Sequence, residues 1–199
     1  MTPRPGLDLD TILQATTKMA DTQGIDEVTL ASLAKTLNIR PPSLYNHING
    51  LPALRKKLAV YGYEQLHKVL IRATVGRSKD NAVRALGEAY MVFVRNHPGL
   101  YEAMLRSPDP EDLELRSIQN ETVDTVIQVL NEYDLGEDQT IHATRGLRSI
   151  LHGFASLEQK RGFGLPLDLD ISFHTLIDIF LTGIDAIKQE NKKSEYLRD

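Results

Sequence analysis

Residues 29–48 read TLASLAKTLNIRPPSLYNHI, and this stretch decides how the N-terminal part of the chain folds. Thr29 can cap a helix, and the apolar residues that follow it recur at the i, i+3, i+4, i+7 spacing of one buried helical face. These apolar residues are Leu30, Leu33, Ala34 and Leu37. A turn at Asn38 and Ile39 then leads into a further short helix. Two helices joined by a tight turn within about twenty residues are a helix-turn-helix pattern.

The doubled proline in this stretch starts the second of these helices and does not break it. The first backbone N–H groups of a helix have no acceptor within the helix, so Pro41 and Pro42 lose no hydrogen bond there. Each proline also fixes φ near the helical value. The residue before a proline is held extended, which places Arg40 at the mouth of the helix.

The polar residues of the second helix form a face that fits a DNA major groove. Leu44 and Ile48 point inward, and the polar side chains lie on the other side. Arginine suits guanine or a phosphate, asparagine suits adenine, and tyrosine suits a phosphate oxygen or a thymine methyl group. The predicted DNA-binding residues are Thr29, Arg40, Pro41, Ser43, Tyr45, Asn46 and His47. The alternative is that they are solvated surface residues, since short two-helix patterns are common in helical proteins.

The distribution of charge favours DNA over that alternative. The chain of 199 residues has a formal net charge of -4, but residues 1–58 carry +2 and residues 59–199 carry -6. No acidic residue occurs between Glu27 and Glu64, a segment that contains Lys35, Arg40, Arg55, Lys56 and Lys57. A basic segment on an acidic body indicates that one end of the molecule faces a polyanion.

The rest of the chain has helical periodicity and no alternating strand pattern, which predicts an all-α protein. Helices are expected at about 80–96, 98–106, 112–132, 137–160 and 170–190, after a long one from about 52 to 75. We expect a helix-turn-helix domain over residues 1–55 and a larger helical domain over residues 56–199. The absence of cysteine, of a signal peptide and of a long apolar run predicts a cytoplasmic protein without a membrane span.

The stretch VTLASLAKTLNIRPPSLYNHINGLPAL, residues 28–54, resembles the DNA-binding domain of TetR-type transcriptional regulators. The positions that match the family pattern are Thr29, Leu33, Ala34, Leu44, Tyr45, His47 and Ile48. Residues 145–173 are similar to the effector domain of the subgroup named for a Trp-His-Gly motif, with Leu151 in place of the tryptophan. Two departures occur in the first stretch: Arg40 stands where the family has Ser or Thr, and Leu51 stands where it has Lys.

The resemblance implies a homodimer formed by the last long helices. Both helices have apolar stripes wider than one core contact needs, and a two-fold interface would bury the surplus. It would also set two reading helices about one DNA turn, roughly 34 Å, apart on a palindromic operator. The predicted interface residues are Leu147, Ile150, Phe154, Phe173, Ile177, Phe180 and Ile184. The alternative is that both stripes are core.

The resemblance also implies a pocket in the larger domain whose small-molecule ligand lowers DNA affinity. The candidate ligand contacts are Met91, Tyr101, Met104, Leu105, His152, Phe154 and Phe163, each of which has a core role as its alternative. His152 stands out because a buried imidazole needs a hydrogen-bond partner and can orient a polar ligand atom.

Enzymatic and metal-binding functions find no support in the residue spacing. The glycines at 162 and 164 lack the third glycine and the preceding strand of a dinucleotide site. The six histidines form no pair at metal-ligand spacing, and no cofactor is expected. The prediction is therefore a ligand-responsive repressor that is not an enzyme. An activator, and a dimeric helical adaptor or ligand-binding protein without DNA binding, are the alternatives.

Overall fold

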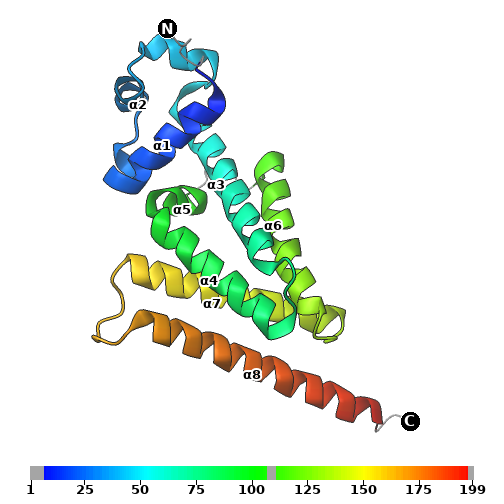
Figure 1. Cartoon of the computed structure of the whole chain (residues 1–199). Coiled ribbons are helices and arrows are strands. Elements are labelled where there is room, and N and C mark those ends of the chain that lie inside the picture. Colours follow the sequence, from blue (N-terminus) through cyan, green and yellow to red (C-terminus); the bar gives the residue numbers. More distant parts are fainter. Residues whose placement is uncertain (1–6, 107–110, 197–199) are drawn as a thin grey trace. The chain divides into compact units, whose positions relative to one another are not determined.

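The computed structural model describes residues 7–106 and 111–196, with side chains through residue 190, and these residues form helices joined by turns (Figure 1). The α-helices are α1 (Leu9–Gln23), α2 (Leu30–Thr36), α3 (Gly50–Thr74), α4 (Lys79–Asn96), α5 (Pro98–Leu105), α6 (Leu113–Asn131), α7 (Glu137–Gln159) and α8 (Leu169–Tyr196). Two 3₁₀ helices, η1 (Ile25–Glu27) and η2 (Pro41–Asn46), lie beside α2 in the chain. The described part contains no strand, which confirms the all-α prediction.

Helix α1 begins and ends where its local chemistry predicts. The Oδ1 atom of Asp8 accepts a hydrogen bond of 2.8 Å from the backbone N–H of Thr11, so Asp8 is the N-terminal cap. The same hydrogen bond holds the pKa of Asp8 below its usual value. Gly24 ends the helix with φ at +93°, a conformation that glycine adopts without steric cost.

The chain packs into two compact units, and the first contains residues up to Gln65 together with Asn96–Gln119. It therefore holds the helix-turn-helix segment, the first part of α3, all of α5 and the start of α6. Helix α5 packs against α1 within this unit. The core of the unit includes Ile12, Leu33, Leu44, Leu54, Leu58, Leu100 and Tyr101, all fully buried. The boundary expected at residues 55 and 56 concerns function and stays a prediction.

The second unit contains Leu66–Arg95 and the chain from Asn120 onward. Its buried residues include Val83, Leu86, Leu130, Leu147, Leu151 and Ile177. The ring of Phe154 lies 4.8 Å from that of Phe163 and 5.2 Å from that of Phe173, measured between centroids. These aromatic contacts join α7, the loop that follows it, and α8.

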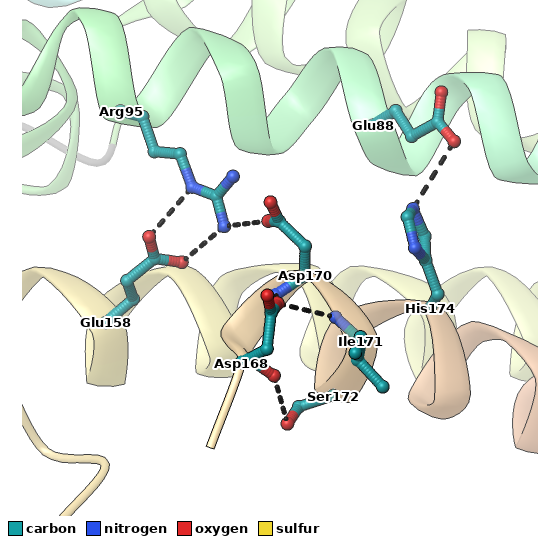
Figure 2. A network of polar contacts seen from close by, with 8 residues as sticks. All are labelled: Glu88, Arg95, Glu158, Asp168, Asp170, Ile171, Ser172 and His174. Atoms are coloured by element: carbon teal, nitrogen blue, oxygen red, sulfur yellow. Dashed lines mark hydrogen bonds and ion pairs between the residues drawn. The ribbon is translucent and has the colours of Figure 1, made fainter. Parts of the chain in front are cut away.

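A polar network fastens α4 to the hairpin of α7 and α8 (Figure 2). Arg95 donates from Nε and Nη2 to the two carboxylate oxygens of Glu158, at 2.8 and 3.1 Å, and its Nη2 lies 2.7 Å from Asp170. The hydrogen bonds to Glu158 are the main reason that the pKa of Arg95 lies above its usual value. Asp168 caps α8 by accepting from the backbone N–H of Ile171 at 3.1 Å. The bidentate geometry fixes the direction of the Arg95 side chain.

A second polar contact joins the turn after α6 to the start of α4. The phenolic oxygen of Tyr133 donates to Asp80 at 2.7 Å, and Tyr133 is buried. Burial raises the pKa of Tyr133 well above its usual value, and the acceptor Asp80 raises it further.

Candidate nucleic-acid interface

The first part of the site is the start of α2, which is fixed by a reciprocal cap. The Thr29 hydroxyl accepts from the Ser32 backbone N–H at 3.0 Å, and the Ser32 hydroxyl accepts from the Thr29 backbone N–H at 2.9 Å. This capping box satisfies two donors that the helix leaves free and so defines the first turn of α2. Thr29 was predicted both to cap the helix and to bind DNA. The structure confirms the cap, and DNA binding by Thr29 stays a prediction.

The turn after α2 is set by a left-handed residue. Asn38 has φ of +54°, its backbone N–H donates to Lys35, and the N–H of Ile39 donates back to Ala34 at 3.0 Å. This pair of bonds is a Schellman motif with asparagine in the left-handed position. The motif turns the chain within two residues, so the following segment packs against α2.

The segment predicted to read the DNA, residues 41–46, is a six-residue 3₁₀ helix, η2. A 3₁₀ helix is wound more tightly than an α-helix. We call η2 the reading segment. Arg40 precedes it in an extended conformation, with φ −80° and ψ 140°, as predicted from the following proline. The first bond of η2 runs from the Ser43 N–H to the Arg40 carbonyl, three residues apart. The predicted proline start is confirmed: neither Pro41 nor Pro42 has an N–H that would be left without an acceptor.

The side chains of this segment divide into a buried and an exposed set. Leu44 and Ile48 are buried, as predicted, and they anchor the segment in the first unit. Tyr45 is 57% exposed. The other predicted contacts are also accessible: Thr29, Arg40, Pro41 and Asn46 are exposed, and Ser43 and His47 are half-buried. The fold therefore presents all seven predicted residues on α2 and η2 without burying any of them.

The basic residues around the segment are not all available to a polyanion. The Lys56 ammonium lies 2.5 Å from a carboxylate oxygen of Asp112 and 3.7 Å from one of Glu114, at the start of α6. The hydrogen bond from Lys56 is the main reason that the pKa of Asp112 lies below its usual value. Lys35 and Arg55 are exposed and face no such pair among the described residues. Sequence alone could not reveal that Lys56 is occupied, because Asp112 is far away in the chain.

Comparison with known proteins identifies the family. The chain is 42% identical over 184 residues to the uncharacterized HTH-type transcriptional regulator YobS of Bacillus subtilis, covering 92% of this chain and 96% of that protein. This chain belongs to the TetR family of transcriptional regulators. The family model that matches residues 83–180 describes a tetracyclin repressor-like C-terminal domain. The tetracycline repressor protein class D of Escherichia coli is 27% identical over 186 residues, covering 93% of this chain and 74% of that protein.

Solved structures show the same fold at lower sequence identity. A protein of unknown function from Rhodococcus has a TM-score of 0.79 at 20% identity, covering 92% of this chain and 98% of that one. The transcriptional regulator SCO7222, a TetR from Streptomyces coelicolor, has a TM-score of 0.75 at 18% identity. The match covers 92% of this chain and 100% of that one. The helical TetR-family architecture expected from the sequence is confirmed by these structures.

The residues predicted to contact a ligand of this TetR-family protein fall into three groups. Met91, Phe154 and Phe163 belong to the second unit, where Phe154 and Phe163 are in ring contact. Tyr101 and Met104 are buried on α5 in the first unit. Leu105 is 49% exposed and His152 is also exposed, so neither side chain lies in the interior of its own unit.

The residues predicted to form the dimer interface are mostly core residues of the single TetR-family chain. Leu147, Phe154, Phe173, Ile177 and Ile184 are buried against their own unit. Ile150 and Phe180 are half-buried. The sequence stripe was wide enough to contain both a core face and a free face, and the buried five occupy the core face. Ile150 and Phe180 keep part of their surface exposed in the single chain, and the role of all seven residues in a dimer stays a prediction.

Two features are absent from the part of the chain that the structure describes. Residues 7–106 and 111–190 contain no group of three or more His, Asp or Glu side chains placed to hold a metal ion. Among the described helices, none is both long enough and apolar enough to cross a membrane. The relatives are named as regulators, and absence of catalysis stays a prediction.

Proposed function

We propose that this TetR-family regulator is a repressor that binds a palindromic operator as a homodimer and is released by a small molecule. The observation that carries the proposal is that polar side chains of η2 are exposed while its apolar side chain is buried in the core of the unit. Arg40, Tyr45 and Asn46 are exposed, whereas Leu44 between them is fully buried. Such a segment can enter a groove without any loss of core packing. A regulator of this kind acts where the chromosome lies, which places it in the cytoplasm.

Arg40 is the residue that distinguishes this chain from the usual family pattern. Because its side chain makes no capping bond to η2, its guanidinium is free to reach a base edge or a phosphate. In this proposal Arg40 supplies the phosphate contact that the family makes with a lysine, because this chain has Leu51 in place of that lysine. The first turn of α3 supplies a second phosphate contact through its backbone amides.

The proposed dimer uses two uncharged stripes on α7 and α8. On α7 the stripe is Gly146, Ile150, Gly153 and Leu157, and on α8 it is Leu176, Ile179, Gly183 and Ile187, each at helical spacing. Leu157 is 49% exposed and Ile179 is 64% exposed. A side-chain carbon added at Gly153 or Gly183 would meet nothing within 4 Å in the single chain. Glycines at such positions let the α7 and α8 helices of a second copy approach closely. Burial of the exposed apolar side chains would then stabilise the contact.

The proposed ligand is a small molecule with an apolar body. Tyr101 and Met104, both buried on α5 within the first unit, supply the apolar contacts in this proposal. The relative named tetracycline repressor protein class D is only 27% identical to this chain, so its name does not identify the ligand of this protein.

Selection from a random DNA pool tests the proposal directly. The full-length protein should enrich an inverted repeat whose half-sites lie about one helical turn apart, roughly 34 Å. Affinity for the winning duplex should fall steeply with salt, because each neutralised phosphate releases counterions. Failure of the folded dimer to enrich any sequence would transfer the role to a dimeric helical adaptor or ligand-binding protein without DNA. Placement of the recovered site relative to a promoter then separates repression from activation.

A further inference from the structure

The start of α5 is capped by a residue that lies far away in the sequence. Asp21, in the last turn of α1, accepts through Oδ1 from the backbone N–H groups of Gly99 at 3.0 Å and Leu100 at 2.9 Å. Its Oδ2 lies 2.9 Å from Nδ1 of His97. The Asp21 side chain is only 13% exposed. One carboxylate of α1 thus satisfies the free donors of the first turn of α5.

The two helices also touch at backbone distance beside this cap. A side-chain carbon added at Gly99 would lie 2.1 Å from the backbone carbon and oxygen of Ala20. No side chain is therefore tolerated between the start of α5 and the end of α1. At the other end of α5, Arg106 donates to Asp26 in η1 at 2.8 Å. Helix α5 is therefore fastened to α1 at one end and to η1 at the other, the two elements that precede the helix-turn-helix segment.

The residue that would ordinarily cap α5 does not do so. His97 occupies the N-cap position with φ −130° and ψ 57°, and its side chain makes no capping bond to the helix. Displacement of α5 would strip Gly99 and Leu100, both buried, of their acceptor unless α1 moved with it. A buried N–H without an acceptor is costly, so the two helices are expected to move as one body.

We infer that Asp21 is a positioning residue that couples α5 to the DNA-reading segment. The inference rests on the proposed function. Tyr101 and Met104 on α5 are proposed ligand contacts, and α1 packs against α2, which in turn packs against the reading segment η2. A shift of α5 on ligand binding is passed by Asp21 to α1 and from there to α2. Coupling is reciprocal, so operator DNA must stabilise the Asp21 cap in turn.

This reciprocity allows a test without the ligand. Hydrogen exchange of the Gly99 and Leu100 amides is measured in the full-length dimer, free and bound to the selected duplex. Binding of the duplex should slow exchange of these two amides by roughly 5- to 150-fold, the usual range of coupling between sites. Asp21→Ala should retain operator binding and lose this slowing. Asp21→Asn retains an acceptor oxygen for both amides and should preserve most of it.

Asp10→Asn is the matched control, because Asp10 is an exposed carboxylate on the same helix that accepts a hydrogen bond only from the Gln14 side-chain amide among the contacts described. This variant should behave like the unsubstituted protein. Equal exchange at Gly99 and Leu100 with and without bound duplex would overturn the coupling role alone, as would full slowing in Asp21→Ala. If no duplex binds at all, the proposed function fails and the coupling fails with it. Should Asp21→Ala not fold, the unsubstituted protein and Asp21→Asn still decide the matter.

Discussion

At the scale of single residues, Tyr45 offers the cleanest test of the reading face. Its ring is 57% exposed and packs on no core, so Tyr45→Ala should leave the melting temperature within about 2 °C. Loss of a base or phosphate contact should weaken operator binding by about 1–3 kcal/mol. Tyr45→Phe separates the two kinds of contact, because it removes the hydroxyl needed for a phosphate and keeps the ring that meets a thymine methyl. Unchanged affinity in both variants would remove Tyr45 from the interface.

The Lys56 and Asp112 pair predicts a pH dependence of stability. The pKa of Asp112 lies below its usual value of 3.8, so the folded protein holds this carboxylate ionised to lower pH than the unfolded chain does. Its contribution is therefore complete above about pH 4 and is lost as pH falls through the depressed pKa. Asp112→Asn should unfold at a lower urea concentration at pH 7, and the difference from the unsubstituted protein should shrink toward pH 3. Glu114→Gln, which removes the more distant carboxylate, should change the urea midpoint less.

At the scale of helices, the sequence predicts boundaries well because short-range chemistry sets them. Asp8, Gly24, Thr29 and the prolines at 41 and 42 act within one turn of their own position, and Thr29 and the two prolines begin their elements as predicted. The face that a helix buries is less readable when two sides are apolar. On α8 the sequence could not decide between Ile177, which is buried, and Ile179, which is 64% exposed.

Contacts between residues far apart in the chain could not be predicted from the sequence, for a different reason. Asp21 and Gly99 are 78 residues apart, and neither belongs to a periodic pattern that would signal the contact. The glycine is required only because the Ala20 backbone passes beside it. The same holds for Lys56, whose place in a basic segment suggested a partner outside the chain, whereas it pairs with Asp112.

The exposed stripes of α7 and α8 give a prediction that belongs to these helices. Ile179→Glu places a charge at the centre of the proposed contact and should shift the protein from dimer to monomer, at a cost of about 2 kcal/mol or more. Helix content should not change, because the side chain is exposed in the single chain. Val92→Glu is the control: Val92 is 54% exposed on α4, outside both stripes. Sedimentation velocity distinguishes the two species, and a dimer that persists in Ile179→Glu would relocate the interface.

For the whole molecule, the two-fold symmetry of the proposed dimer would double the effect of every substitution in the reading segment. If Arg40 contacts a phosphate, the slope of log affinity against log salt should become shallower by about 2 in Arg40→Ala, since each subunit loses one contact worth about 1. If Arg40 instead reads a base, the slope should change little, and the variant should tolerate substitutions at one symmetric pair of operator positions. Arg40→Lys sharpens the distinction, because lysine keeps the charge but lacks the fork that binds guanine in two places. A slope that falls by only 1 would mean that a single subunit carries the contact, which is incompatible with a symmetric dimer on an inverted repeat.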